Sequence, residues 1–98
     1  MRRGTTPTLN FILPFDTGHL SDGWVTISQA GEIVIDKQLS ACSCEANKVS
    51  VKLTQEETLE LADRITYIQL RVKTNDGDVL ASEIITTEAR RILKEGAI

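Results

Sequence analysis

The sequence predicts an all-β fold, an antiparallel β-sandwich of immunoglobulin-like shape with about six to seven strands. Short segments in which apolar and polar residues alternate recur along the chain, and this period of two places the apolar side chains on one face of a strand. Turns rich in Gly, Asn and Asp separate these segments, and no long helical pattern alternates with them. One short helical connector is expected near residues 55–62. A chain of 98 residues is expected to form a single domain, residues 1–98.

The opening segment "RGTTPTLNFILPFD", residues 3–16, is interpreted as the first strand and not as an export signal. A signal needs an unbroken apolar run of about 7–15 residues, whereas Leu9–Phe15 is interrupted by Asn10 and Pro14. The alternation within Thr8–Leu13 predicts a strand instead. No stretch approaches the roughly 18 apolar residues of a membrane span. We therefore expect the protein to be cytoplasmic when synthesised and to have no membrane partner.

The second and third strands are predicted as a hairpin. Trp24–Gln29 and Glu32–Leu39 each alternate, and the pair Ala30-Gly31 between them supplies a two-residue turn. The apolar residues expected to face inward are Val25, Ile27, Ile33 and Ile35. The segment Ser40–Asn47 that follows has no such pattern and is expected to be irregular.

The fourth strand and the helical connector follow in the middle of the chain. Lys48–Thr54 has the clearest alternation in the sequence. Thr54 is followed three residues later by Glu57, which is the spacing of a helix capping box. The connector is therefore expected to make a turn or two of helix, whose apolar residues cover one end of the core: Leu59, Leu61 and Ala62.

The last two strands are predicted as a second hairpin. Ile65–Thr74 alternates, with its even-numbered apolar residues facing inward, and Asn75–Asp78 supplies the turn to Val79–Ala89. The adjacent pair Ile84-Ile85 breaks the alternation, which indicates either a β-bulge or burial on both faces. The tail has both helical and strand spacing, and we favour a strand that ends near Arg91.

The residues that carry chemistry are too few for an enzyme. His19 is the one histidine, and it lies in a loop with no shaped serine or cysteine nucleophile beside it in the sequence. Zinc requires three or four protein ligands, whereas only Cys42 and Cys44 can join this histidine. Free thiols are the favoured interpretation, with metal or redox use and intermolecular pairing as alternatives. We expect no catalytic residues, no cofactor and no metal.

Charge and aromatic content favour protein contacts over nucleic acid. The net charge is −3, and the eleven basic residues are scattered among fourteen acidic ones, which argues against a nucleic-acid partner. Trp24, Tyr67 and Arg71 are predicted on an outer sheet face, and such residues are enriched at binding hot spots. They form the candidate interface. Two interpretations of Trp24 remain, a core residue or an exposed anchor for a partner, and we favour partial burial.

Three segments resemble a known family: "GTTPTLNFILPFD", "VSVKLTQEETLEL" and "IQLRVKTNDGDVLASEIITTEARRIL". They resemble short phage-related proteins encoded in prophages of Gram-positive bacteria, and the layout is similar to the N-terminal β-sandwich domain of phage baseplate upper proteins. The resemblance implies a non-enzymatic structural or assembly role in the tail or baseplate, with the virion as a second location. The implied partners are other phage structural proteins or further copies of the chain. The alternative is a small carbohydrate- or ligand-binding β-sandwich module that uses Trp24 or Tyr67 as a platform.

Overall fold

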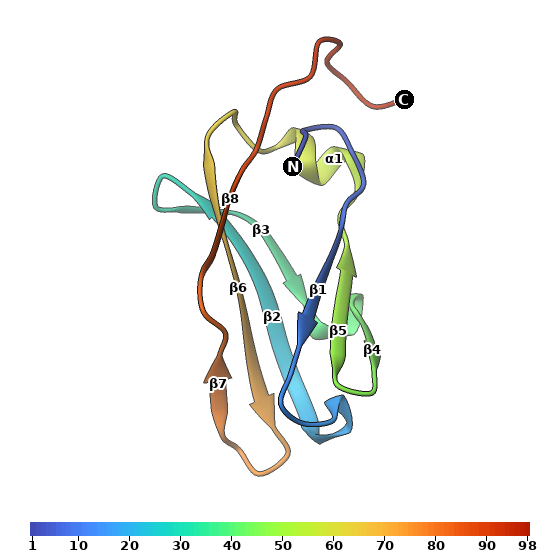
Figure 1. Cartoon of the computed structure of the whole chain (residues 1–98), viewed down its shortest axis with the longest axis vertical. Coiled ribbons are helices and arrows are strands. Elements are labelled where there is room, and N and C mark those ends of the chain that lie inside the picture. The colour runs from blue at the N-terminus through green and yellow to red at the C-terminus, as the bar shows by residue number, and fades with distance from the viewer.

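Two antiparallel sheets face each other in a sandwich-like arrangement (Figure 1). The computed structural model describes residues 1–98, and its longest dimension is 46 Å. The smaller sheet has the strand order β1 (Thr8–Ile12), β5 (Lys48–Lys52), β4 (Ser43–Glu45). The larger has the order β3 (Glu32–Gln38), β2 (Leu20–Gln29), β6 (Ile65–Thr74), β7 (Val79–Ala81), with β8 (Ile85–Glu88) also paired to β6. The helical segments are α1 (Gln55–Leu59) and two short 3₁₀ turns, η1 (Thr17–His19) and η2 (Leu39–Ala41). The predicted all-β class and the helical connector are confirmed.

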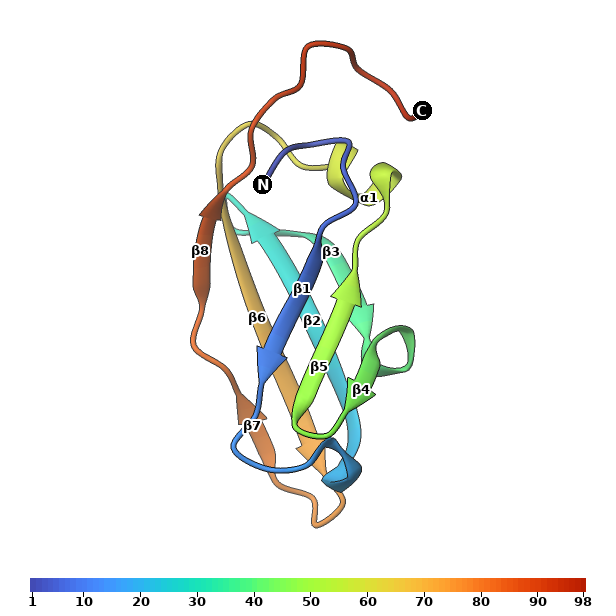
Figure 2. The same ribbon diagram turned by 45° about the vertical axis from the view of Figure 1, so that its right-hand side comes forward.

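The core lies between the two sheets and is formed by the inward faces of their strands (Figure 2). Twelve buried apolar residues make up one cluster. On β2, β5 and β6 every second residue contributes to it, as the alternation predicts. Full burial of one such side chain contributes about 1.5–3 kcal/mol. The chain contains no helix that is both long and apolar enough to cross a membrane.

A β-bulge in the β2–β3 hairpin corrects one predicted core residue. Ile27 lies opposite Ile35, but the next residue, Ser28, lies opposite Ile33, so Val34 is an extra residue on β3. One inserted residue inverts the alternation beyond it. The inward orientation expected for Ile33 is therefore wrong: its side chain is 64% exposed, while Val34 packs against the core.

A second bulge divides the predicted last strand, Val79–Ala89, into β7 and β8. The register along β6 shifts by one residue between the two, which is the bulge alternative given for Ile84-Ile85. At the break, the Ser82 backbone N–H donates to the Leu70 carbonyl at 2.8 Å, and the Leu70 N–H donates to Ser82 Oγ at 2.9 Å. The Ser82 carbonyl turns away and accepts from the Gln69 amide at 2.9 Å. The Ser82 side chain and backbone groups are thus all paired at the break.

Three strand boundaries also differ from the sequence prediction. β4 forms within Ser40–Asn47, which was expected to be irregular, because backbone pairing with β5 holds it while its side chains stay exposed. β2 begins at Leu20 and not at Trp24, since it continues to pair with β6. β8 ends at Glu88, short of the expected Arg91, and a single parallel bridge to the N-terminal segment follows it.

The helical connector closes one end of the core. The predicted capping box is present: Thr54 Oγ1 accepts from the Glu57 N–H at 3.1 Å, and the Glu57 carboxylate accepts from the Thr54 N–H at 2.9 Å. Thr58 is fully buried and its hydroxyl donates to the Thr5 carbonyl at 2.8 Å, which ties the N-terminal segment to α1. Leu61 covers the core as expected, whereas Ala62 is exposed.

A buried amide joins this connector to the larger sheet. Gln29 is 5% exposed; its Nε2 donates to the Ala62 carbonyl and to Thr66 Oγ1, each at 2.9 Å. Its Oε1 accepts from the Ala62 N–H at 2.8 Å. A buried polar side chain stabilises a fold only when it is paired in this way. The connector is therefore held at a fixed position against β2.

Candidate protein-binding surfaces

The three predicted interface residues lie on the outer face of the larger sheet. The β2–β6 register places Trp24 opposite Arg71 and Ser28 opposite Tyr67. Odd-numbered residues of β6 alternate with its buried even-numbered ones, so Tyr67 and Arg71 share one face, away from the core. Trp24 and Tyr67 are each 41% exposed, so both side chains lie outside the core and are partly covered by their neighbours.

Three isoleucines enlarge this surface beyond the sequence prediction. Ile33 lies opposite Ser28, because the bulge turns it outward, and Ile65 follows Tyr67 on the same face of β6. Ile84 lines a shallow hollow of about 80 Å³ together with Tyr67. All three are at least 48% exposed. We call the following residues the outer patch: Trp24, Ile33, Ile65, Tyr67 and Ile84.

A polar hollow adjoins the Trp24 end of the outer patch. It has a volume of about 250 Å³ and is lined in part by Asp22, Arg71 and Lys73. Gln38 donates to the Asp22 carboxylate at 3.3 Å. An indole beside two cations and one carboxylate offers stacking and hydrogen bonds to a small polar molecule. This hollow is the part of the surface that suits a ligand and not a protein.

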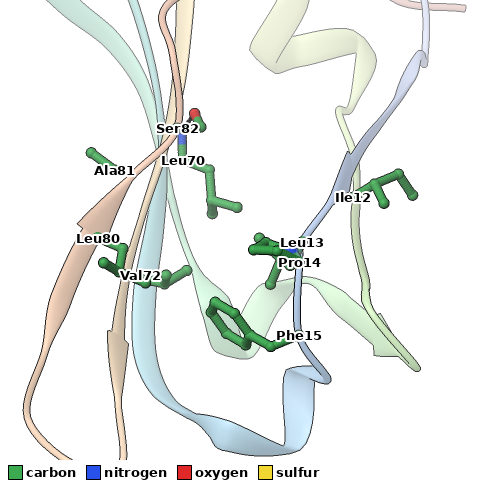
Figure 3. A pocket seen from close by; sticks show the side chains of 9 residues that line it. All are labelled: Ile12, Leu13, Pro14, Phe15, Leu70, Val72, Leu80, Ala81 and Ser82. Carbon is green, nitrogen blue, oxygen red and sulfur yellow. Dashed lines mark hydrogen bonds between the residues drawn. The ribbon is translucent and has the colours of Figure 1, made fainter.

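A second opening lies between the two sheets, at the side where β1 faces β7. This side groove has a volume of about 310 Å³, and Figure 3 shows the residues that line it. The Phe15 ring, from the loop after β1, and the Leu70 side chain, from β6, extend toward the opening, whereas the Ile12 side chain points away from it. The lining contains no ionisable side chain: Ile12, Leu13, Pro14, Phe15, Leu70, Val72, Leu80, Ala81 and Ser82.

One edge of β1 beside the side groove has unpaired backbone groups. Leu53 N–H donates to the Pro7 carbonyl at 2.9 Å, and Leu13 N–H donates to the Asn47 carbonyl at 2.8 Å, so odd-numbered residues of this segment bond to β5. In an antiparallel ladder the residues between them direct their N–H and C=O groups the other way. No strand pairs with that edge, along which the exposed groups belong to Thr8, Asn10 and Ile12.

The titratable residues do not gather into a reactive site. No three His, Cys, Asp or Glu side chains lie together in a metal-binding arrangement. His19 packs against Phe15, with ring centroids 6.4 Å apart, and its imidazole makes no hydrogen bond to a serine or cysteine. Cys42 and Cys44 are free thiols. Burial, and second the neighbouring Cys44, raise the pKa of Cys42 above its ordinary value, which disfavours the reactive thiolate.

Comparison with known proteins gives no family or relative for this chain. No family model, curated protein or solved structure matches it. Its function is therefore argued from the surfaces of the molecule.

Proposed function

We propose that this protein is a non-enzymatic phage structural or assembly protein, associated with the tail or baseplate, that acts through protein–protein contacts. The observation that carries the proposal is the outer patch, in which five large apolar side chains are exposed on one sheet face. Exposed apolar patches on soluble proteins mark contact sites, and Trp, Tyr and Arg dominate the energetics of such contacts. The phage assignment rests on the sequence resemblance.

The size of this face suits a protein partner. The central strand β2 has ten residues. At about 3.3 Å per residue and about 4.8 Å between strands, the outer face is roughly 33 Å by 19 Å, or on the order of 600 Å² in projection. A standard protein–protein interface buries about 800 Å² on each partner. The face therefore corresponds to an interface at the lower end of the standard size range.

We also infer that the sandwich has immunoglobulin-like connectivity. The order β1-β5-β4 is that of strands B-E-D, and the order β3-β2-β6-β7 is that of strands C′-C-F-G. In this assignment β1 is the edge strand against which the first strand of an immunoglobulin domain would pair. The strand order supports the inference, and domains of this shape commonly present a sheet face to a partner.

Gene deletion and complementation in a lysogen that carries the prophage test the proposed function. We expect deletion to lower the yield of infectious particles, and the wild-type gene to restore it. A Trp24→Asp/Tyr67→Asp variant should fail to restore it, whereas Lys52→Ala, on the exposed side of β5, should succeed as the matched control. An unchanged yield after deletion would refute the proposal.

The polar hollow beside Trp24 favours a carbohydrate- or ligand-binding module as the second candidate function. The chain has one tryptophan, so its intrinsic fluorescence reports on this hollow directly. A saturable change in fluorescence with one member of an oligosaccharide panel, lost in Arg71→Ala, would support this function. A panel that leaves the spectrum unchanged rules it out for those sugars.

A further inference from the structure

The residues after β8 form an arm in which Leu93 and Ile98 have no partner, whereas Ile92 packs beside Gly4. We define the arm as residues 91–98. Leu93 and Ile98 are fully exposed, at 101% and 107%. Residues 95–98 of the arm are held by polar contacts alone. Arg3 pairs with Glu95. The Gln55 side-chain amide accepts from the Ile98 N–H at 2.7 Å and donates to the Ile98 carbonyl at 3.1 Å. Burial of these two large aliphatic side chains against another surface would therefore be favourable in free energy.

The arm and the side groove are complementary in polarity and in charge. The groove is apolar and uncharged, as an aliphatic side chain requires. Its neighbouring hollow shares Phe15 and Leu80 with it and carries Asp76 and Asp78 from the β6–β7 turn. The arm carries Arg91 and Lys94 next to Leu93. Opposite charges at the margin of an apolar contact favour association in one orientation.

The arm cannot fill the groove of its own molecule. The arm leaves the end that holds α1, whereas the β6–β7 turn and the groove beside it lie toward the other end (Figure 1). From Arg90 back to Leu80 the chain runs ten residues along one sheet edge, roughly 30 Å. From Arg90, Leu93 reaches about 10 Å and Ile98 about 27 Å even when fully extended. The Ile98 backbone is also bonded to Gln55 of α1, at the end away from the groove. The occupant of the groove is therefore the arm of another copy.

We propose that the arm of one copy binds as an extended strand along β1 of the next copy, with an apolar side chain in the side groove. This inference rests on the proposed function as an assembly protein. The unpaired N–H and C=O groups of β1 supply the backbone hydrogen bonds, as in other strand-addition contacts. Leu93 and Ile98 are an odd number of residues apart, so they point to opposite faces of a strand. Leu93 enters the groove, and Ile98, about 17 Å farther along the added strand, lies on the outward face of that strand.

This contact joins two different surfaces that lie toward opposite ends of the molecule. Such a head-to-tail contact leaves one free arm and one free groove after each addition. It therefore builds a ring or a filament, or a closed dimer in which two antiparallel copies exchange arms, and each of these is an assembly of repeated copies.

Two complementary variants test the arm contact by sedimentation velocity. Leu93→Asp/Ile98→Asp blocks the arm and leaves the groove intact; Leu80→Glu blocks the groove and leaves the arm intact. Both sets of side chains are exposed, so both variants should fold, which far-UV circular dichroism checks. We expect wild type to form dimers or larger species as its concentration rises. Each variant alone should be a monomer, and an equal mixture should form a heterodimer of twice the monomer mass.

The outcomes separate the arm contact from the proposed function. A monomeric wild type, or assembly that persists in the arm variant, refutes the arm contact. Assembly lost in Trp24→Ala but kept in both variants assigns self-association to the outer patch; the arm contact then fails while the proposed function stands. If the mixture forms heterodimers but gene deletion leaves the particle yield normal, the arm contact is supported and the proposed function is refuted.

Discussion

Replacement of Gln29 by Leu removes the three hydrogen bonds that hold the α1–β6 connector against β2. The substitution keeps the approximate size of the side chain, so it leaves no large cavity. The Ala62 N–H loses its partner but lies at the surface, where water can replace it, and the Ala62 carbonyl still accepts from the Arg64 N–H at 2.9 Å. Thr66 is fully buried and keeps only a 3.3 Å bond to the Arg64 carbonyl.

The expected cost follows from these partners. Each lost hydrogen bond contributes about 1 kcal/mol net, and the buried hydroxyl left poorly paired adds to this, while the greater hydrophobicity of leucine offsets a part. We expect the free energy of unfolding to fall by about 2–3 kcal/mol. For a domain of this size that corresponds to a decrease in Tm of about 10–20 °C.

Urea denaturation followed by Trp24 fluorescence measures this change. Trp24 lies on the outer face, so the substitution at the buried Gln29 does not alter the signal directly. Gln38→Leu is the control: Gln38 is an exposed strand amide with one 3.3 Å bond, and its replacement should change stability by less than about 0.5 kcal/mol. If Gln29→Leu is as stable as this control, the buried network does not stabilise the fold.

Two further substitutions test the capping box and the second bulge. Burial would raise the pKa of Glu57, but hydrogen bonds from Lys37 and Thr54 outweigh it and lower the pKa below its usual value. The resulting stabilisation is present above about pH 4.3 and is lost as the pH falls through the lower folded pKa. Glu57→Gln should therefore lower the unfolding free energy by up to about 1 kcal/mol at neutral pH and not in acid; a difference independent of pH contradicts this. Ser82→Ala leaves a β6 amide without its acceptor and should cost about 1–2 kcal/mol in the same urea assay, against an exposed control, Ser43→Ala. Equal stability of these two serine variants would show that the bulge does not depend on the hydroxyl.

Local sequence patterns predict the elements whose signals are local. β6 has the predicted bounds, Ile65–Thr74, because four buried residues alternate without interruption up to a strong turn. The capping box at Thr54 is likewise read from residues three apart. The broken alternation at Ile84-Ile85 indicates the second bulge as one of two alternatives, whereas nothing in the sequence of β3 indicates the first, because that extra residue depends on the partner strand β2. β4 forms only because β5 lies beside it.

The same distinction applies to the surfaces. Trp24, Tyr67 and Arg71 share the predicted outer face, since alternation alone determines the face of each. Ile33 joins them only through a bulge. The side groove brings Phe15 next to Leu80, and no local pattern indicates that residues so far apart in the chain will meet.

The interruption at Ser82 has a consequence for how the edge of the larger sheet can pair with further strands. An incoming strand that is in phase with β7 meets β8 one residue out of phase, so it cannot continue a regular ladder along that rim. β1 has no such discontinuity. Exposed sheet edges commonly aggregate by pairing with further strands, and the register shift hinders such pairing along the edge formed by β7 and β8. Strand addition is therefore favoured at β1.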